Sequence, residues 1–236
     1  MKTALHLAYN GKAFFGSQIQ KETSQTVMGV LTHVLAKLGI NTQVVASGRT
    51  DKGVHATMQI CHIELPPYWN DLDKLSRVTN EMLPSSIVVK KIYKVNDDFH
   101  ARYSAKKRTY RYLIKTATRN PFEADFITFL TECDYEKITR NIKLFEGTHD
   151  FSNFIKTGSD EKSTIRTIYK AFAYKYKDII VLHFEANGFL RTQIRFMVAA
   201  LLHLDEEQIY AKLACTKDYK IKPAPPEGLY LAKIKY

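Results

Sequence analysis

Residues 47–56 read Ser-Gly-Arg-Thr-Asp-Lys-Gly-Val-His-Ala, and the first half of the chain is organised around this stretch. It places one carboxylate, Asp51, between two cations, Arg49 and Lys52, and between two glycines. Glycine adopts backbone conformations that residues with a β-carbon resist, so the stretch predicts a sharp loop. The flanking cations favour the ionised form of Asp51. Two interpretations follow: an ordinary polar turn, or a loop that presents a catalytic carboxylate.

The segments on both sides of this loop predict strands, so the loop should join two strands. Residues 44–46 lead into it and residues 59–65 lead out of it. Further out, the pattern predicts a strand at 2–9, a helix that starts at a Thr23 or Ser24 cap and stops at Gly39, a helix at 72–82 after Pro66-Pro67, and a strand at 87–95. This order of strand, helix, strand, strand, helix and strand is the split βαβ order of ferredoxin-like domains.

The second half of the chain predicts the same order with longer connections. Its predicted strands are 110–115, 164–176, 179–186 and 229–234, and its predicted helices are 135–145, 189–204 and 205–213. The sequence therefore predicts an α+β protein with two domains, residues 1–102 and residues 103–236. No residue-level repeat relates the two halves.

The composition predicts a soluble, globular, cytoplasmic protein. The chain has 236 residues, of which 45% are hydrophobic and 25% charged, and this length allows one large domain or two small ones. The longest apolar run, residues 196–202, is too short to cross a bilayer, and the first residues lack the apolar core of a signal peptide. The scattered cysteines, Cys61, Cys133 and Cys215, favour neither a disulfide framework nor a Cys-rich zinc site.

The charge of the chain points to a polyanionic partner. There are 35 Lys and Arg against 24 Asp and Glu, which gives a formal net charge of +11. Residues 99–122 contain no acidic side chain, and in 106–112 basic residues interleave with aromatic ones, the composition of a surface that grips phosphates and stacks on bases. A strand edge protected from aggregation by its charges is the alternative. The cations of this window are Arg102, Lys106, Lys107, Arg108, Arg111, Lys115 and Arg119.

Blocks of sequence along the whole chain resemble, in order and content, the motifs of one known family. They are residues 9–18, 48–56, 99–112, 145–154, 163–168, 188–195 and 224–231. Residues 48–56, with the pattern Gly-Arg-Thr-Asp-x-Gly-Val-His-Ala, resemble the catalytic motif of the TruA-type tRNA pseudouridine synthases. The chain departs from the family pattern at Asn10, Ser17, Gln193 and Ile194, where the family usually has Asp, Trp, Met and Val.

The resemblance implies a fold and a set of site residues. It implies two ferredoxin-like halves that form one continuous antiparallel or mixed sheet, with helices on one face and an active-site cleft between the halves. Asp51 would be the catalytic nucleophile or base, Tyr110 the active-site aromatic residue, and Arg195 the arginine that pairs with the aspartate. The expected substrate contacts are Arg49, Tyr110, Leu229, His55, Arg102, Lys106, Lys107 and Arg108.

The resemblance also implies the reaction and the partners. The substrate would be tRNA, with uridines 38, 39 and 40 of the anticodon stem-loop as targets, and the protein would act as a homodimer. The reaction breaks the bond from C1′ to N1, turns the uracil and rejoins it through C5, with no net redox change, so no cofactor is expected. Arg195 would hold Asp51 in place, and Leu229 would keep water out of the pocket.

Several alternatives stay open from the sequence. His149 and Asp150 are adjacent, but a capping Asp beside a hydrogen-bonded His is more typical than a metal or catalytic pair, and no metal is expected. The departures at Ser17, Gln193 and Ile194 leave room for a catalytically inactive tRNA-binding homologue. A paralogue that acts on a different RNA position, or a different Asp-dependent N-glycosyl hydrolase or transferase, is also compatible with Asp51 alone.

Overall fold

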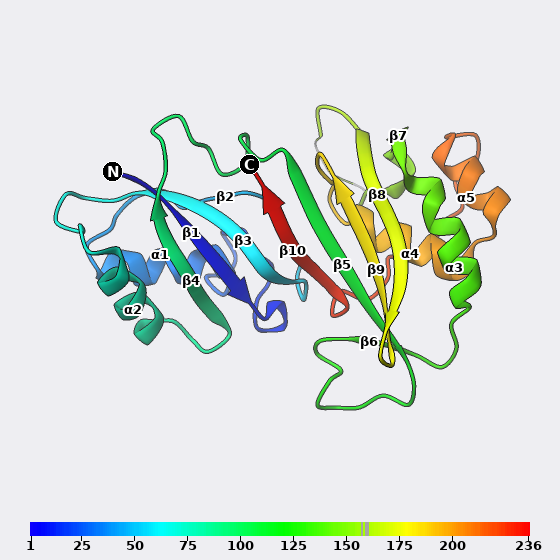
Figure 1. Cartoon of the computed structure of the whole chain (residues 1–236), viewed down its shortest axis with the longest axis horizontal. Helices are drawn as coiled ribbons and strands as arrows, with labels where there is room; N and C mark the ends of the chain where they lie inside the picture. The colour runs from blue at the N-terminus through cyan, green and yellow to red at the C-terminus, as the bar shows by residue number, and fades with distance from the viewer. Residues whose placement is uncertain (157, 159–160) are drawn as a thin grey trace. The chain divides into compact units, whose positions relative to one another are not determined.

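The computed structural model describes residues 1–156, 158 and 161–236, and the chain forms two compact units (Figure 1). Unit 1 comprises Met1–Lys106 and Tyr230–Tyr236, and unit 2 comprises Lys107–Leu229. The predicted boundary at residues 102 and 103 lies four residues earlier. The prediction also placed residues 230–236 in the second domain, whereas their strand is hydrogen-bonded in unit 1. Within the described ranges, no helix has both the length and the apolar character needed to cross a membrane.

Unit 1 is built on a mixed sheet with the strand order β4-β1-β3-β10. β1 is antiparallel to both β3 and β4, and β2 pairs with β3. β10 is parallel to β3 through Tyr230 and Leu231, which face His55 and Ala56. The elements are β1 (Lys2–Tyr9), η1 (Gly11–Ala13), α1 (Val27–Lys37), β2 (Val45–Ala46), β3 (His55–Glu64), α2 (Leu72–Met82), β4 (Ile87–Lys94) and β10 (Leu229–Lys235).

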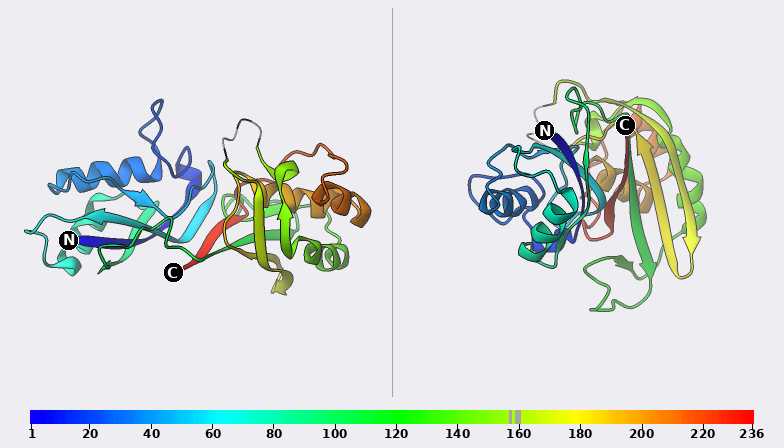
Figure 2. Two further views of the ribbon diagram at one scale, coloured as in Figure 1. Left: turned by 90° about the horizontal axis from the view of Figure 1, so that it is seen from above. Right: turned by 60° about the vertical axis from the view of Figure 1, so that its left-hand side comes forward.

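The helices of unit 1 start at side-chain caps. Thr26 caps α1 by accepting a hydrogen bond from the Gly29 N–H at 3.1 Å, so the predicted cap at Thr23 or Ser24 is wrong by two or three residues. Asp71 caps α2 by accepting from the Lys74 N–H at 2.8 Å. The buried side of α1 faces the sheet, and Figure 2 shows this helix along one face of the strands of its unit.

Unit 2 contains the strands β5-β9-β8-β7 of the mixed ten-stranded sheet, with β6 parallel to β5, and it also contains helices. β5 is antiparallel to β9, and β9 to β8. Its elements are β5 (Lys107–Thr116), β6 (Thr128–Leu130), α3 (Tyr135–Asn141), η2 (Ile142–Phe145), β7 (Gly147–Asp150), η3 (Ser152–Phe154), β8 (Ile165–Tyr176), β9 (Ile179–Ala186), α4 (Gln193–His203) and α5 (Glu206–Leu213). Both units thus confirm the predicted α+β class.

The helix α4 begins four residues later than the apolar pattern predicted. Thr192 has a φ of 66°, in the left-handed region, and the Leu190 N–H donates to the Gln193 side-chain oxygen at 2.7 Å. A left-handed residue interrupts helical hydrogen bonding, so Phe189 lies in the preceding loop although its side chain is apolar. Leu190 is buried and Phe189 half-buried, so apolar residues outside the helix extended the predicted helix toward its start.

The two faces of β5 separate the tyrosines of this strand from most of its basic residues. Side chains alternate along a strand, so Tyr110 and Tyr112 share one face, where both are buried. Lys107 and Arg111 lie on the opposite face. The prediction of a single mixed surface is therefore wrong for this strand, although Arg108 shares the face of Tyr110.

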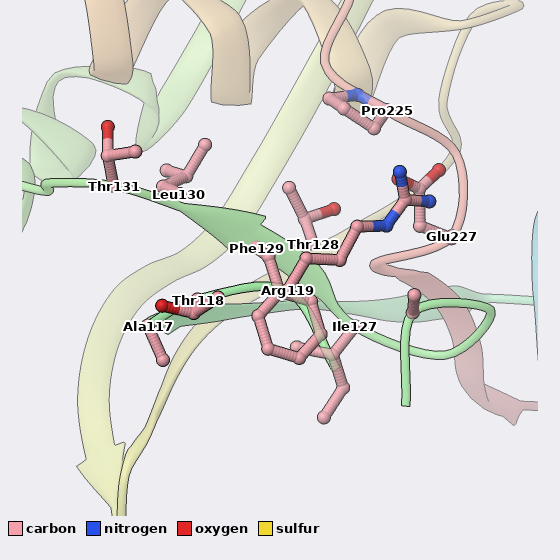
Figure 3. Close-up of a pocket in the computed structure, with 11 residues that line it drawn as sticks. Ala117, Thr118, Arg119, Ile127, Thr128, Phe129, Leu130, Thr131, Pro225 and Glu227 are labelled. Atoms are coloured by element: carbon pink, nitrogen blue, oxygen red, sulfur yellow. The ribbon is translucent and has the colours of Figure 1, made fainter. Parts of the chain in front are cut away.

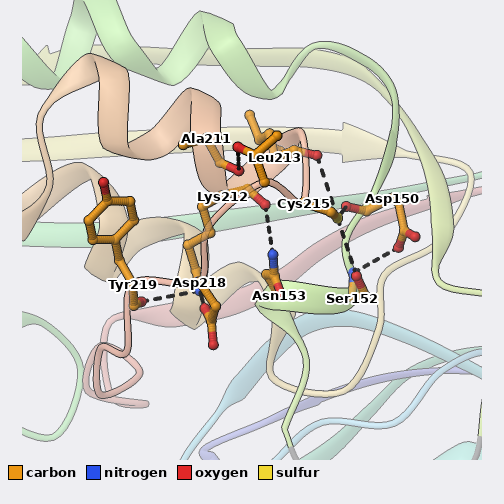
Figure 4. Close-up of polar contacts among 10 residues, drawn as sticks. Asp150, Ser152, Asn153, Ala211, Lys212, Leu213, Cys215, Asp218 and Tyr219 are labelled. Atoms are coloured by element: carbon orange, nitrogen blue, oxygen red, sulfur yellow. Dashed lines mark hydrogen bonds and ion pairs between the residues drawn. The ribbon is translucent and has the colours of Figure 1, made fainter.

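A buried lysine ties α5 to two other segments of unit 2 (Figure 4). Lys212 is 2% exposed, and its ammonium donates to the Asp218 carboxylate and to the Tyr219 carbonyl at 3.2 Å. The same ammonium lies 5.1 Å from the centre of the Phe154 ring. The Lys212 carbonyl accepts a hydrogen bond from the Asn153 side chain at 3.1 Å. This cluster explains part of the 145–154 sequence block as structural.

We expect Lys212→Met to lower the free energy of unfolding by about 1.5–3 kcal/mol, since it removes hydrogen bonds made by a charged group while keeping an apolar stem. Denaturant unfolding of the full chain measures this change. Lys74→Met, at an exposed position of α2, is the matched control and should change the free energy by less than about 0.5 kcal/mol. Equal effects of both substitutions would contradict a role for the Lys212 cluster.

Candidate active site

The Asp51 loop of unit 1 is a tight turn that carries three charged side chains, Arg49, Asp51 and Lys52. The Val54 N–H donates to the Asp51 carbonyl at 3.1 Å, and Gly53 has a φ of 82°. Arg49 is exposed and Asp51 partly exposed, whereas the side chain between them, Thr50, is buried. The predicted turn at Gly53 is confirmed. The arrangement combines a partly exposed Asp51 with a backbone that is hydrogen-bonded within the turn.

Side chains from other segments of unit 1 support this turn. The Tyr9 hydroxyl lies 2.9 Å from the Thr50 hydroxyl, and the Ser17 hydroxyl accepts the Thr50 N–H at 2.8 Å. Gln59 donates to the Gly48 carbonyl at 2.9 Å and accepts from the Ser47 hydroxyl at 2.5 Å. These contacts are polar, buried or partly buried, and join residues 11 to 41 positions apart, and no local pattern in the sequence predicts them.

His55 is held in the interior of unit 1. The Gly11 N–H donates to its Nδ1 at 3.1 Å, and its ring stacks on Tyr230 with centroids 4.7 Å apart. The side chain is buried. These contacts link the end of the 48–56 block to the 9–18 block and to β10, whereas a contact of His55 with RNA remains a prediction.

In unit 2, Tyr110, Arg195 and Leu229 come from three different elements. Tyr110 is a buried side chain of β5 and meets the ring of Phe189 edge-on, with centroids 5.3 Å apart. The Arg195 guanidinium donates from Nε to the Ala224 carbonyl at 2.6 Å, and the Ala224 N–H donates back to the Arg195 carbonyl at 3.0 Å. Leu229 is buried where β10 starts.

The segment 224–229 connects these elements. The Tyr112 hydroxyl donates to the Pro225 carbonyl at 2.8 Å, and the Leu113 N–H donates to the Gly228 carbonyl at 2.8 Å. A β-carbon at Gly228 would lie 2.7 Å from the Leu113 carbonyl oxygen. Burial raises the pKa of Tyr112, while the charge of Arg195 acts in the opposite direction. These supporting residues lie in the 99–112 and 224–231 sequence blocks, except Leu113, which directly follows the first of them.

The basic residues predicted to contact RNA differ in their surroundings. Arg102 and Lys106 are exposed. The Lys107 ammonium pairs with the buried carboxylate of Glu185 at 3.2 Å and lies 4.5 Å from the Tyr169 ring centre. Arg108 donates to the Asn187 carbonyl at 3.0 Å. Lys107 and Arg108 therefore have structural partners, which the sequence analysis missed.

Unit 2 also contains a cavity of about 350 Å³ beside the 224–229 segment (Figure 3). Its lining is mostly apolar, with the charged side chains of Arg119 and Glu227 at its wall. It shares Thr128 and Pro225 with the hydrogen bonds that hold Tyr112. Tyr110, Arg195 and Leu229 are not among its lining residues.

His149 and Asp150 make contacts of a structural kind. The Asp150 carboxylate accepts the Ser152 N–H at 2.9 Å, and a hydrogen bond from Thr164 lowers its pKa. The His149 Nε2 lies 2.9 Å from the Glu146 carbonyl oxygen. The arrangement favours the turn-forming interpretation of this pair over a catalytic one.

Comparison with known proteins assigns the chain to a family. Residues 6–104 and 142–236 match the model of the tRNA pseudouridine synthase family. The chain is 39% identical over 241 residues to a tRNA pseudouridine synthase A of Campylobacter jejuni, with all of both chains covered. It is 39% identical to that of Wolinella succinogenes, over 98% of this chain and 92% of the relative, and 36% identical to that of a Geobacillus species, over 98% and 96%. The chain belongs to the tRNA pseudouridine synthase family, whose members are isomerases.

Proposed function

We propose that this protein converts uridine to pseudouridine at positions 38, 39 and 40 of the tRNA anticodon stem-loop, with Asp51 as nucleophile or base. The observation that carries the proposal is the structure of the Asp51 loop. Asp51 is partly exposed, and the preceding residue, Thr50, is hydrogen-bonded to Tyr9 and Ser17. A preorganised carboxylate is what the reaction needs, because cleavage of the glycosidic bond places positive character on the sugar. We place the reaction in the cytoplasm, where its tRNA substrate is available.

Each further site residue has a role in the proposed reaction. The Asp51 carboxylate either attacks C1′ or assists removal of a sugar proton as the uracil leaves. Tyr110 holds the detached uracil with its ring while the base turns and rejoins through C5. Arg195 is the proposed partner of the Asp51 carboxylate, as the family resemblance implies, and Leu229 excludes water, which would otherwise hydrolyse the intermediate to abasic RNA.

The cations provide the proposed tRNA contacts. Arg49 is exposed next to the buried Thr50, so its guanidinium is available to stack on the target base or to bind a phosphate as the base leaves the stem. Arg102 and Lys106 are exposed as well. Three target uridines in different sequence contexts favour recognition of RNA shape over base sequence.

The departure at Gln193 speaks against the alternative of an inactive tRNA-binding homologue. The Gln193 side chain accepts the Leu190 N–H at 2.7 Å and lies 3.6 Å from the Met197 sulfur, so it takes a structural place at the start of α4. Arg195, two residues later in the same helix, is retained. The substitution therefore repacks a helix end and leaves the proposed catalytic group in place.

The test uses tRNA transcripts tritiated at uridine C5. Each pseudouridine formed replaces the C5 hydrogen by the glycosidic bond, so tritium release to water counts the reaction directly. We expect release from an anticodon stem-loop substrate, with the product mapped to positions 38–40. Release with products elsewhere would favour the paralogue alternative, and absence of release would overturn the enzyme assignment for this chain.

We also propose that two copies form a homodimer, as the family resemblance implies. A candidate surface is the face of the unit 2 sheet opposite to Tyr110 and Tyr112. There the partly exposed rings of Phe172 and His183 stack with centroids 4.4 Å apart, and Tyr174 lies beside Phe172 at 6.0 Å. Contiguous aromatic side chains on a sheet face are typical of a protein interface.

We expect sedimentation analysis to give about twice the chain mass of 27.2 kDa. Phe172→Glu should shift the protein toward monomer, because it places a charge in the aromatic patch. The matched control is Tyr210→Glu, at an exposed aromatic residue of α5, which should leave the mass unchanged. A monomeric wild-type protein would contradict the dimer, and a dimeric Phe172→Glu variant would contradict this surface.

A further inference from the structure

We propose that Ser17 is a positioning residue for the Asp51 loop, acting through hydrogen bonds to Thr50. The inference rests on the proposed role of Asp51 and extends it to a residue where the chain departs from the usual tryptophan of the family pattern. Ser17 therefore replaces an aromatic side chain by a hydroxyl with a defined partner.

Ser17 forms hydrogen bonds with both backbone polar groups of Thr50. Its hydroxyl accepts the Thr50 N–H at 2.8 Å, and its own N–H donates to the Thr50 carbonyl at 3.1 Å. Ser17 is 1% exposed and Thr50 is 7% exposed, so little water is available to replace these bonds. Asp51 is the next residue along the chain, and its backbone position follows from that of Thr50.

The two hydrogen bonds between Ser17 and Thr50, called here the Ser17 clamp, are connected to the start of α1. The carbonyls of Gly16 and Ser17 accept the N–H groups of Val27 and Met28, at 3.2 Å and 2.9 Å. These donors belong to the first turn of α1, where backbone N–H groups lack partners within the helix. Gly16 has a φ of 102°. One series of hydrogen bonds thus connects the start of α1, the peptide of residues 16–17 and the Asp51 loop.

Tyr9 completes the support from the sheet side. Its hydroxyl lies 2.9 Å from the Thr50 hydroxyl, and burial raises the pKa of Tyr9 to about 12. Hydrogen bonds from Thr50, Gln59 and Ser17 oppose that rise. Tyr9 therefore remains a neutral phenol at physiological pH. The Thr50 backbone is held by Ser17 and its side chain by Tyr9.

The alternative is that Ser17 only stabilises the fold. The two roles differ in what the loss of the hydroxyl should change. Loss of stability alone lowers the unfolding temperature but leaves kcat of the folded enzyme intact. Loss of positioning lowers kcat at a temperature where the protein stays folded, because small displacements of a reacting group cost large factors in rate.

The test compares the full-length wild type with Ser17→Ala in the tritium-release assay, with tRNA binding and thermal unfolding measured in parallel. We expect kcat to fall about 10- to 100-fold, while the dissociation constant for tRNA changes less than about twofold. Tyr9→Phe should lower kcat in the same direction. The Thr50 amide in Ser17→Ala should exchange with solvent at least about tenfold faster, since it loses its acceptor.

Asp71→Ala is the matched control, because it removes the cap of α2 and lowers stability at a position away from the loop. Its kcat should equal that of wild type. Wild-type kcat in Ser17→Ala, or an equal loss in Asp71→Ala, would overturn the inference. Absence of tritium release from the wild type would instead refute the proposed function, and the Thr50 exchange rate would still report whether the clamp exists.

Discussion

Replacing Asp51 by asparagine is expected to abolish tritium release from tRNA, with kcat lowered at least about 10³-fold, which corresponds to about 4 kcal/mol of transition-state stabilisation. The amide keeps the shape of the side chain but carries no charge. It is a poor nucleophile and a poor base, so it serves neither of the two proposed mechanisms. Single-turnover tritium release with enzyme in excess measures the chemical step apart from product release.

The fold and tRNA binding should survive this substitution. The turn is held through the backbone of Asp51 and through Thr50, so Asp51→Asn should melt at nearly the wild-type temperature and retain the tRNA dissociation constant within a few-fold. The control Asp98→Asn, at an exposed carboxylate of unit 1, should keep full activity. Release by Asp51→Asn within tenfold of wild type would contradict the assignment of Asp51.

Replacing Gly11 by alanine is expected to destabilise unit 1 and to displace the end of the Asp51 loop. A β-carbon at Gly11 would lie 2.0 Å from the Val54 carbonyl oxygen and 2.4 Å from its carbon. Both are backbone atoms, so relief requires movement of the chain rather than of a flexible side chain. We expect the free energy of unfolding to fall by about 1–3 kcal/mol or more, and kcat to fall more than about tenfold.

The chain offers a matched glycine for comparison. A β-carbon at Gly188 would lie 3.7 Å from the Arg166 side chain, an ordinary van der Waals contact. Gly188→Ala should therefore change the free energy of unfolding by less than about 0.5 kcal/mol. Denaturant unfolding and the tritium assay on both variants make the comparison. Equal stability of Gly11→Ala and Gly188→Ala would show that the 9–18 block tolerates a side chain at Gly11.

Elements with strong local signals were predicted residue for residue. β1, α2 and β9 have the predicted bounds of 2–9, 72–82 and 179–186, because their patterning and their turn or cap residues agree. The start of α1 was misplaced, because Thr23, Ser24 and Thr26 are all acceptable caps. The Thr23 hydroxyl accepts the Gln25 N–H at 3.1 Å in the preceding turn, and the choice of cap depends on contacts outside the segment.

The sequence predicted only those parts of the candidate site that lie within its motifs. The position of Asp51 in a glycine-bounded turn followed from residues 47–56. The pairing of Lys107 with Glu185 did not, because these residues are 78 positions apart and meet only through the register of β5 with β9. A cation in a basic run is easily taken for a nucleic-acid contact, whereas here it neutralises a buried carboxylate.

The sequence by itself determined the α+β class, the split βαβ order of the first half and the glycine-bounded turn at Asp51, because each depends on neighbouring residues. Only the tertiary structure decided that β10 joins β3, that β5 separates its tyrosines from most of its cations, and that Ser17 clamps Thr50 across 33 residues of chain. Those features are hydrogen bonds and packing between distant segments. Their partners are selected by geometry when the chain folds, and no local pattern encodes that choice.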